Sequence, residues 1–265
     1  MRCHRTSARS KALFMKSNIE WQKWGERDPL YAVSTWQGKE RGSQNAWTDK
    51  EFYQLGGIDW ADFQTHWQHY GLNFGTCVEI GCGAGRITKQ LGQCFQHVTG
   101  LDVSQHQLDY AREHVPKPNV AFTLSDGTRL PIADRACDAV FSVHVFQHFE
   151  SHDGAFAVFR DIHRVLKPGG TLMIHLPLYD LPDTKISILF PPVIAFAKRL
   201  SDLKAAMDRH FLRIGKWKPV MRRLRFDRQH LLHKLESMGY SRIEFRMFPV
   251  QSNHSYHEFV FATKS

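Results

Sequence analysis

The 265-residue chain lacks a long hydrophobic run. Its longest apolar stretch, residues 186–197, is interrupted by Ser187, Pro191 and Pro192, whereas a helix that crosses a bilayer needs about 20 apolar residues. The first fourteen residues are basic but contain no continuous apolar core, which argues against a secretory signal. We therefore expect a soluble, cytoplasmic protein.

Cysteine is scarce, with five residues and no C-x-x-C pair. Two of the cysteines lie in or beside expected buried strands, a placement that favours a reduced compartment over a disulfide framework. His66 and His69 have the helical spacing of a metal-binding pair, but no cluster of carboxylate or cysteine ligands accompanies them. The sequence therefore predicts no metal site.

Acidic residues are fewer than basic ones, and the formal net charge is +9. Residues 198–234 contain twelve Lys or Arg and three Asp, so the formal net charge of this segment alone equals that of the whole chain. Such a segment suits an anionic substrate, a membrane surface or nucleic acid. A solvated face around a cap helix is the plainer alternative.

Short β-rich runs alternate with helical patterns from residue 76 to residue 177, which is typical of βαβ units in a parallel sheet. Strands are expected at about 76–80, 97–101, 119–124, 137–143 and 170–176. Helices are expected at about 85–94, 104–114, 153–166 and 227–238, and two final strands at about 241–248 and 257–263. The predicted organisation is a disordered tail (1–16), an N-terminal helical cover (17–75) and an α/β domain (76–265).

The N-terminal cover is rich in aromatic residues between positions 21 and 70, in a helical pattern broken at Asp28-Pro29 and between Gly38 and Gly42. We expect most of these rings to pack the cover onto the sheet.

Three glycines follow the first expected strand at positions 81, 83 and 85, and Asp102 ends the second strand. Glycines without Cβ atoms let backbone N–H groups approach a ligand, and a carboxylate at the neighbouring strand tip can accept hydrogen bonds from a ribose diol. This pairing predicts a nucleoside site. A dinucleotide fingerprint needs its third glycine at position 86, where the chain has Arg86, so a pyrophosphate ligand is disfavoured.

The G-x-G-x-G turn after an acidic strand residue resembles motif I of the class I S-adenosylmethionine-dependent methyltransferases, in particular domains of the type 11 and type 25 kinds. The resemblance continues in order over residues 78–177. Residues 101–104 look like the ribose motif, 125–128 like the adenine loop, 137–142 like the fourth strand, and 164–172 like the following helix, turn and fifth strand.

The resemblance implies a Rossmann-like, seven-stranded, mostly parallel sheet with helices on both faces, and S-adenosylmethionine as cofactor. It also implies roles for individual residues. Glu79 would organise the glycine loop and the cofactor's amino group. The same carboxylate could also cap the amides of the loop, and the two roles are compatible. Arg86 would contact the methionine carboxylate or merely cap the surface. The implied cofactor-binding set is Glu79, Gly81, Gly83, Gly85, Arg86, Asp102, Val103, Asp126, Gly127 and Ser142.

Within that set, the base and sugar contacts are the most specific. Asp102 would bind the ribose, Val103 would pack on the adenine, and Asp126 would accept from the adenine amine with the Gly127 amide close to the ring. The Asp126-Gly127 pair is also a common turn.

Two histidines follow the fourth expected strand and are candidates for catalysis. In several methyltransferases of small molecules this position reads Glu-His, whereas here it is Gln147-His148. His148 is a candidate base or orienting residue, and His144 a candidate pocket residue. Either could instead be a structural histidine.

The segment 178–226 is too long for an ordinary connection between two elements. It begins at the carboxyl end of the fifth strand, which is the end where ligands bind in open α/β sheets. We predict that this insertion is a mobile cap over the acceptor site.

The sequence thus predicts a methyltransferase that acts on an oxygen or nitrogen of a small or lipid-like, possibly anionic acceptor. An RNA or protein methyltransferase, favoured by the basic segment, is the main alternative. An inactive cofactor-binding partner subunit is another, because the glutamate before His148 is missing.

Overall fold

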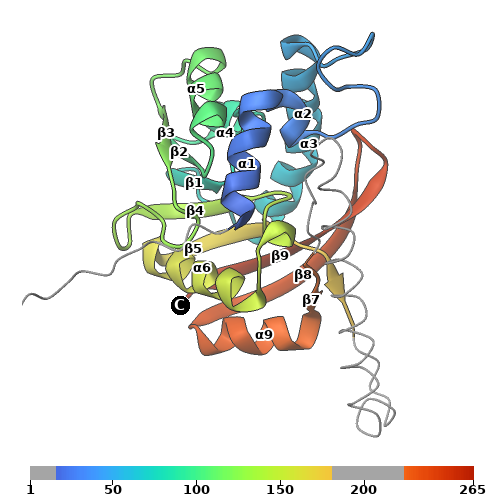
Figure 1. Cartoon of the computed structure of the whole chain (residues 1–265). Coiled ribbons are helices and arrows are strands. Elements are labelled where there is room, and N and C mark those ends of the chain that lie inside the picture. The colour runs from blue at the N-terminus through green and yellow to red at the C-terminus, as the bar shows by residue number, and fades with distance from the viewer. Residues whose placement is uncertain (1–15, 181–223) are drawn as a thin grey trace, which may run out of the picture.

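The computed structural model describes residues 16–180 and 224–265 (Figure 1). Its helices are α1 (Lys16–Arg27), α2 (Pro29–Val33), α3 (Asp49–Tyr70), α4 (Thr88–Cys94), α5 (Gln105–His114), the 3-10 helix η1 (Phe146–His148), α6 (His152–Val165) and α9 (Arg228–Ser237). Its strands are β1 (Thr76–Ile80), β2 (His97–Asp102), β3 (Val120–Leu124), β4 (Cys137–Ser142), β5 (Leu166–His175), β6 (Leu178–Tyr179), β7 (Phe226–Asp227), β8 (Tyr240–Val250) and β9 (Ser255–Lys264).

Seven of the strands form one sheet in the order β3-β2-β1-β4-β5-β9-β8. The first five are parallel, whereas β9 runs antiparallel to both β5 and β8. The predicted mostly parallel sheet with a terminal hairpin is confirmed. The chain order reverses between β1 and β4, and open α/β sheets bind their ligands beside the carboxyl ends of strands at such a point.

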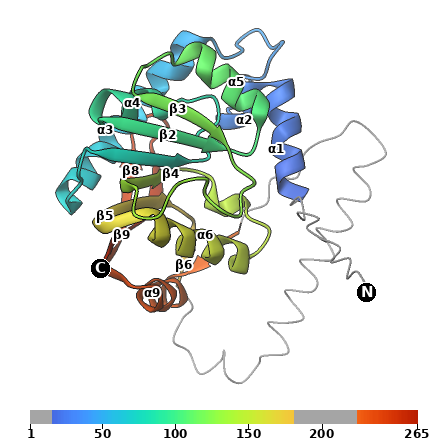
Figure 2. The same ribbon diagram turned by 90° about the vertical axis from the view of Figure 1, so that its left-hand side faces the viewer.

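Alternate residues of the strands face two different cores, as the two-residue period of a strand requires. Val78, Val140 and Leu172 pack on the side of α6 and α9. Cys77, Ala139 and Met173 pack on the side of α3 and α4. Both faces are therefore covered by helices, as predicted (Figures 1 and 2).

Helix α3 is defined at both ends by local sequence. Thr48 and Glu51 form a capping box at its start, and Gly71, with φ +117°, ends it in a left-handed conformation. Four aromatic side chains of α3 belong to the core against the sheet, namely Trp60, Phe63, Trp67 and Tyr70. Phe52 and Tyr53 are also buried, but they pack with Leu30 of α2 and Ala84 of the glycine turn. The predicted packing on the sheet is thus confirmed for the second half of α3.

Helices α1 and α2 lie beside the carboxyl ends of the parallel strands. The side-chain amide of Asn18 donates to the carbonyl of Asp126 at 2.7 Å, and the Ser17 amide donates to Glu150 Oε1 at 3.0 Å. Helix α1 is therefore fixed to two loops that follow β3 and β4.

Most strand and helix boundaries lie within a few residues of those predicted. Strand β5 is the main difference, because it begins at Leu166 rather than near 170. Its pairing with β4 shifts register between the Cys137–Leu166 and Ala139–Thr171 pairs, so the Lys-Pro-Gly-Gly stretch 167–170 is an irregularity within the strand.

Only the ends of the predicted cap insertion are described. They pair as the parallel strands β6 and β7, and the Phe226 amide donates to the Pro177 carbonyl at 2.8 Å. The rest of the cap, most of the basic segment 198–234 and nearly all of the predicted disordered tail lie outside the described residues.

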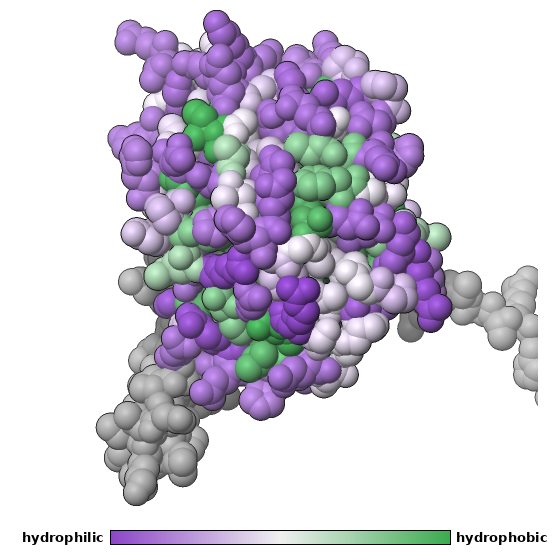
Figure 3. All heavy atoms as spheres, turned by 180° about the vertical axis from the view of Figure 1, so that it is seen from behind, coloured by the Kyte–Doolittle hydropathy of each residue, from purple (hydrophilic) through white to green (hydrophobic). Residues whose placement is uncertain are grey.

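Among the described helices, none is long and apolar enough to cross a membrane. On the face opposite to that of Figure 1, hydrophobic areas are interrupted by hydrophilic side chains (Figure 3). The four cysteines of the described segments are free thiols.

Candidate active site

The glycine turn after β1 is held against the tip of β2. The amides of Gly81 and Cys82 both donate to the carbonyl of Leu101, at 2.7 and 2.9 Å. Gly81 and Gly83 have φ of +72° and +51°, and a Cβ at either position would overlap the side chain of Val145 or Val33. Glycine is required here by both backbone conformation and space.

Asp102 connects β2 to this turn. Its carboxylate accepts from the Gly83 amide at 2.8 Å and from the Ser104 amide at 2.9 Å. Burial raises the pKa of Asp102, while the backbone hydrogen bonds from Ser104 and Gly83 act in the opposite direction. The side chain is thus held in one orientation at the edge of a cavity.

That cavity has a volume of about 300 Å³ and extends over the carboxyl ends of β1, β2 and β4. One part is formed by the glycine turn, Asp102 and Val103, and another by the segment after β4 with His144 and His148. Helices α1 and α2 and the loop after them complete the wall with Trp21, Val33 and Trp36.

Arg86 lies in the cavity wall and forms a buried ion pair with Asp59 of α3. It is only 5% exposed, so the alternative that it caps the surface is wrong. Nε of Arg86 and Oδ1 of Asp59 are buried, and within the described segments neither atom has a hydrogen-bond partner. Both residues line the cavity, so this end carries a cation and an anion that neutralise each other, with Nε and Oδ1 themselves enclosed by protein.

Three predicted residues are close to the cavity but do not line it. Glu79 is buried and accepts from the Thr88 hydroxyl at 2.5 Å, and burial raises its pKa to about 8. The Ser142 hydroxyl donates to the Ile80 carbonyl at 2.8 Å, which joins β4 to the end of β1. Gly85 faces Val115 and Ala111 instead of the cavity. These three residues position the turn.

The two residues predicted to contact the adenine, Asp126 and Gly127, are placed differently relative to the cavity. Gly127 lines the cavity, whereas Asp126 does not. Oδ1 of Asp126 accepts from the Thr128 amide, the Thr128 hydroxyl and the Arg129 amide, so this carboxylate stabilises its own turn. The contact of Asp126 with an adenine amine stays a prediction.

His148 lies in the cavity wall in η1. Its ring packs edge-on against Trp21 of α1 with centroids 5.0 Å apart, and its Nε2 lies 3.0 Å from Nε2 of Gln147. The Gln147 carbonyl accepts from the Leu224 amide at 2.7 Å. The returning end of the 178–226 insertion is therefore attached to the segment that carries His148.

His144 belongs to a cluster that sequence reasoning missed. Its amide donates to Nδ1 of His175 at 3.4 Å, and Nε2 of His175 lies 3.4 Å from Nδ1 of His257. Burial lowers the pKa of all three histidines, that of His175 to about 3. The expectation of no metal site rested on His66 and His69 and overlooked this group; the ring of His66 stacks on Phe248 instead.

A signal for this cluster was present in the predicted strands. His175 stands at the end of the fifth strand and His257 at the start of the last, and the two strands are antiparallel neighbours. His175 pairs with Phe259, which makes His257 its diagonal neighbour on the same face. No sequence pattern predicted that Asp59 would contact Arg86, because α3 is distant in sequence from the glycine turn.

Comparison with known proteins supports the same class of fold. Residues 78–174 match the methyltransferase domain family. With the sheet order and the glycine turn, this match identifies the chain as carrying a class I S-adenosylmethionine-dependent methyltransferase domain. S-Adenosylmethionine is the cofactor of this class.

Relatives of known function resemble only part of the chain. Methyltransferase GfsG of Streptomyces halstedii is 34% identical over 102 residues, which cover 37% of this chain and 36% of the relative. Sterol 24-C-methyltransferase ERG6B of Gibberella zeae is 30% identical over 115 residues, covering 40% of this chain and 30% of the relative. The chain thus spans about a third of the length of these relatives.

Solved structures resemble nearly the whole chain. Magnesium protoporphyrin IX methyltransferase from Synechocystis, solved with bound S-adenosylhomocysteine, superposes with a TM-score of 0.57 at 16% identity, covering 93% of this chain and 99% of that one. A putative methyltransferase from Haloferax volcanii, in complex with the activator Trm112, has a TM-score of 0.58 at 13% identity, covering 93% and 98%. These similarities show a shared fold.

Proposed function

We propose that this protein transfers a methyl group from S-adenosylmethionine to an oxygen or nitrogen atom of a small or lipid-like acceptor. One observation carries the proposal: a single cavity runs from the glycine turn and Asp102 to His144 and His148. A methyl donor bound at the first end and an acceptor at the second would meet without crossing bulk solvent.

The residues of the first end fit the parts of the cofactor. Asp102 keeps acceptor capacity for a ribose diol, because its carboxylate has about four lone-pair sites and the backbone amides of Gly83, Val103 and Ser104 do not occupy all of them. Val103 and the Gly127 amide would contact the adenine. Arg86 and Asp59 line the same end of the cavity, and their charges suit the carboxylate and the ammonium group of the methionine part.

S-Adenosylmethionine, when bound, supplies a methyl group already activated on a sulfonium. The protein therefore has to orient the acceptor, exclude water and take up a proton where the acceptor is protonated. His148 lies where it could take up this proton, because its ring contacts Trp21 and Gln147 in the cavity wall. The aromatic wall of Trp21 and Trp36 would exclude water from the same region.

The lining supports the proposed class of acceptor. Trp21, Val33, Trp36 and Phe149 give that part of the wall an apolar character, which suits an acceptor with an aromatic or aliphatic body. Sterol 24-C-methyltransferases and an O-methyltransferase, rstn1 of Aspergillus nomiae, are among the relatives.

The test is transfer of labelled methyl from S-adenosylmethionine to a panel of phenols, amines and fatty or isoprenoid acids by the full chain. For the accepted compound, His148→Ala should lower turnover about 100-fold or more with cofactor affinity unchanged, the usual scale of general-base catalysis. His69→Ala, which removes an exposed histidine of α3, is the matched control and should not change the rate. Parent-like turnover in His148→Ala would make this histidine structural.

RNA is the second candidate acceptor, because the segment that returns from the insertion carries Arg225, Arg228 and Lys234. Probable tRNA methyltransferase 9B of Mus musculus is also among the relatives. A tRNA acceptor would give binding that weakens steeply with salt. Methylation of tRNA in the same assay, with no turnover of small compounds, would replace the first proposal. Cofactor binding without any transfer would favour an inactive partner subunit.

A further inference from the structure

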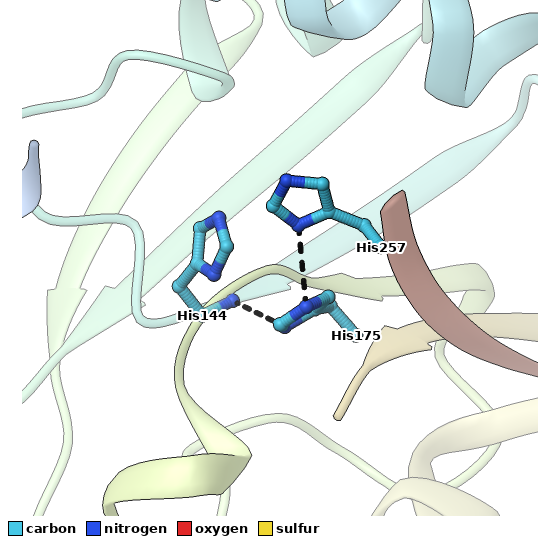
Figure 4. Close-up of side chains that lie close together, drawn as sticks. All are labelled: His144, His175 and His257. Carbon is cyan, nitrogen blue, oxygen red and sulfur yellow. Dashed lines mark hydrogen bonds between the residues drawn. The ribbon is translucent and has the colours of Figure 1, made fainter. Parts of the chain in front are cut away.

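Three histidine side chains converge beside the cavity from three separate segments. His144 comes from the loop after β4, His175 from the last residue of β5, and His257 from the start of β9 (Figure 4). One ring nitrogen of each lies within 4.8 Å of those of the other two. Because the chain positions are up to 113 residues apart, the fold itself creates this grouping.

The spacing of two of the nitrogens, on His175 and His257, matches that of two ligands on one metal ion. Nε2 of His175 and Nδ1 of His257 are 3.4 Å apart, beyond the usual 2.7–3.2 Å of a hydrogen bond from nitrogen. Two nitrogens bound tetrahedrally at about 2.0–2.1 Å from Zn²⁺ are about 3.3–3.4 Å apart. The three rings are inclined to one another by 53–69°, so none of the pairs is stacked.

Neighbouring groups are placed to support such a site. The side-chain amide of Asn253 lies beside the outer nitrogen of His257, with Nδ2 at 3.2 Å and Oδ1 at 3.4 Å from Nε2. Oδ1 also accepts from the Ser255 amide at 2.9 Å, and its second lone pair can accept the N–H that remains on Nε2 when Nδ1 binds a metal. His144 has φ +61°, an uncommon conformation for a residue with a side chain, and this backbone turn places its ring opposite the other two. Binding through Nε2 of His175 would place the remaining ring proton on Nδ1, which now accepts the 3.4 Å contact from the His144 amide, so that amide would have to turn away.

We propose that His144, His175 and His257 bind a divalent transition metal ion of the Zn²⁺ type, with a fourth position open to the cavity. Imidazole nitrogens are ligands that Zn²⁺, Co²⁺ and Cu²⁺ share, and three protein ligands with one exchangeable position is the arrangement of catalytic zinc sites. His144 and Asn253 line the cavity, whereas His175 and His257 lie behind them. The exchangeable ligand is therefore an oxygen donor from the cavity, either water or an ionised oxygen of a bound molecule.

The site is testable without any methyl transfer. Co²⁺ titrated into the metal-stripped full chain, without a polyhistidine tag, should give the visible absorption of a four-coordinate ion and saturate at one equivalent. Zn²⁺ should displace it. His175→Ala and His257→Ala should each weaken Co²⁺ binding at least 100-fold, with folding checked by circular dichroism. A variant lacking the pair at helical spacing, His66→Ala with His69→Ala, is the control and should bind as the parent does.

A second measurement addresses the open position. Azide added to the Co²⁺-loaded protein should shift the absorption bands, because an exchangeable fourth ligand faces the cavity. An unchanged spectrum would overturn the open position. No saturable absorption, or equal binding by parent and His257→Ala, would overturn the metal site and leave a hydrogen-bonded histidine chain. Either result would leave the proposed methyl transfer untouched, because cofactor binding is measured separately.

Discussion

At the scale of single residues, burial governs the carboxylates around the glycine turn. Glu79 is buried behind the turn, and the desolvation of its carboxylate raises the pKa to about 8 in the folded protein, against the ordinary 4.5. The hydrogen bond from Thr88 and the charge of Arg86 lower it only in part. The folded state thus binds a proton more tightly at Glu79 than the unfolded chain does.

The expected consequence is a loss of stability with rising pH. The contribution of Glu79 is fully present below pH 4.5 and is lost as the pH rises through about 8. Relative to Glu79→Gln, the parent's free energy of unfolding should fall by up to about 1.4 kcal/mol per pH unit in this range. Urea unfolding at pH 5 and pH 7.5 measures the difference.

Glu51→Gln is the control, because this exposed carboxylate has a lowered pKa and stays ionised at both values. It should change stability equally at pH 5 and pH 7.5. Parallel pH dependence of the parent and Glu79→Gln would show that Glu79 is ionised in the folded protein.

At the scale of elements, the glycine turn depends on close approach as well as on backbone conformation. Gly81 and Gly169 have nearly the same φ, +72° and +76°. A Cβ at Gly81 would overlap Val145, whereas one at Gly169 has no atom within 4 Å. Substitution by alanine therefore adds the same backbone strain at both positions and a steric overlap only at Gly81.

We expect Gly81→Ala to lower the free energy of unfolding by about 1–3 kcal/mol more than Gly169→Ala, the usual cost of overpacking. Denaturant unfolding of the two variants measures this. Cofactor affinity should fall only in Gly81→Ala, because the shift of Val145 or of the turn changes the cavity wall. Equal destabilisation by both substitutions would mean that the turn relaxes without disturbing its neighbours.

Elements were the most predictable part of this structure. The short β-rich runs of β1 and β4 and the glycines that follow β1 indicate these elements directly, because they are local properties of the chain. The start of β5 was wrong because Pro168, Gly169 and Gly170 suggest a turn, whereas the chain keeps its pairing with β4 across an irregularity. That pairing depends on the neighbouring strand, which no local pattern contains.

At the scale of the whole molecule, contacts of α1 hold the N-terminal segment at the cavity wall. Ser17 and Asn18 hydrogen-bond to Glu150 and Asp126, and Trp21 packs on His148. These contacts join loops on opposite sides of the cavity, so a ligand that orders both loops should also stabilise α1.

Hydrogen exchange with and without S-adenosylhomocysteine tests this coupling. Amides of α1 should exchange several-fold more slowly when the ligand is bound, whereas those of α9, on the far side of the α6 core, should not change. Equal exchange of α1 in both states would mean that the cover is already rigid and that ligand entry occurs elsewhere.

The part of the candidate site formed by residues close together in the sequence was predictable. The part formed by contacts between distant segments was not. Gly81, Gly83 and Asp102 lie within two consecutive βα units, so spacing alone brought them together. Asp59 reaches Arg86 from the N-terminal helix, and His257 reaches His175 across the last strand pair. These contacts depend on how α3 and β9 pack, which a single sequence does not specify.

S-Adenosylmethionine should bind at the tips of β1 and β2, and calorimetric titration with S-adenosylhomocysteine measures this binding. Asp102→Ala should raise Kd about 30- to 1000-fold, since loss of hydrogen bonds to an ionised acceptor costs on the order of 2–4 kcal/mol. Asp109→Ala, which removes an exposed carboxylate of α5 away from the cavity, is the control and should retain the affinity. NAD should not compete. An unchanged Kd in a folded Asp102→Ala protein, or NAD binding in place of S-adenosylhomocysteine, would contradict the account.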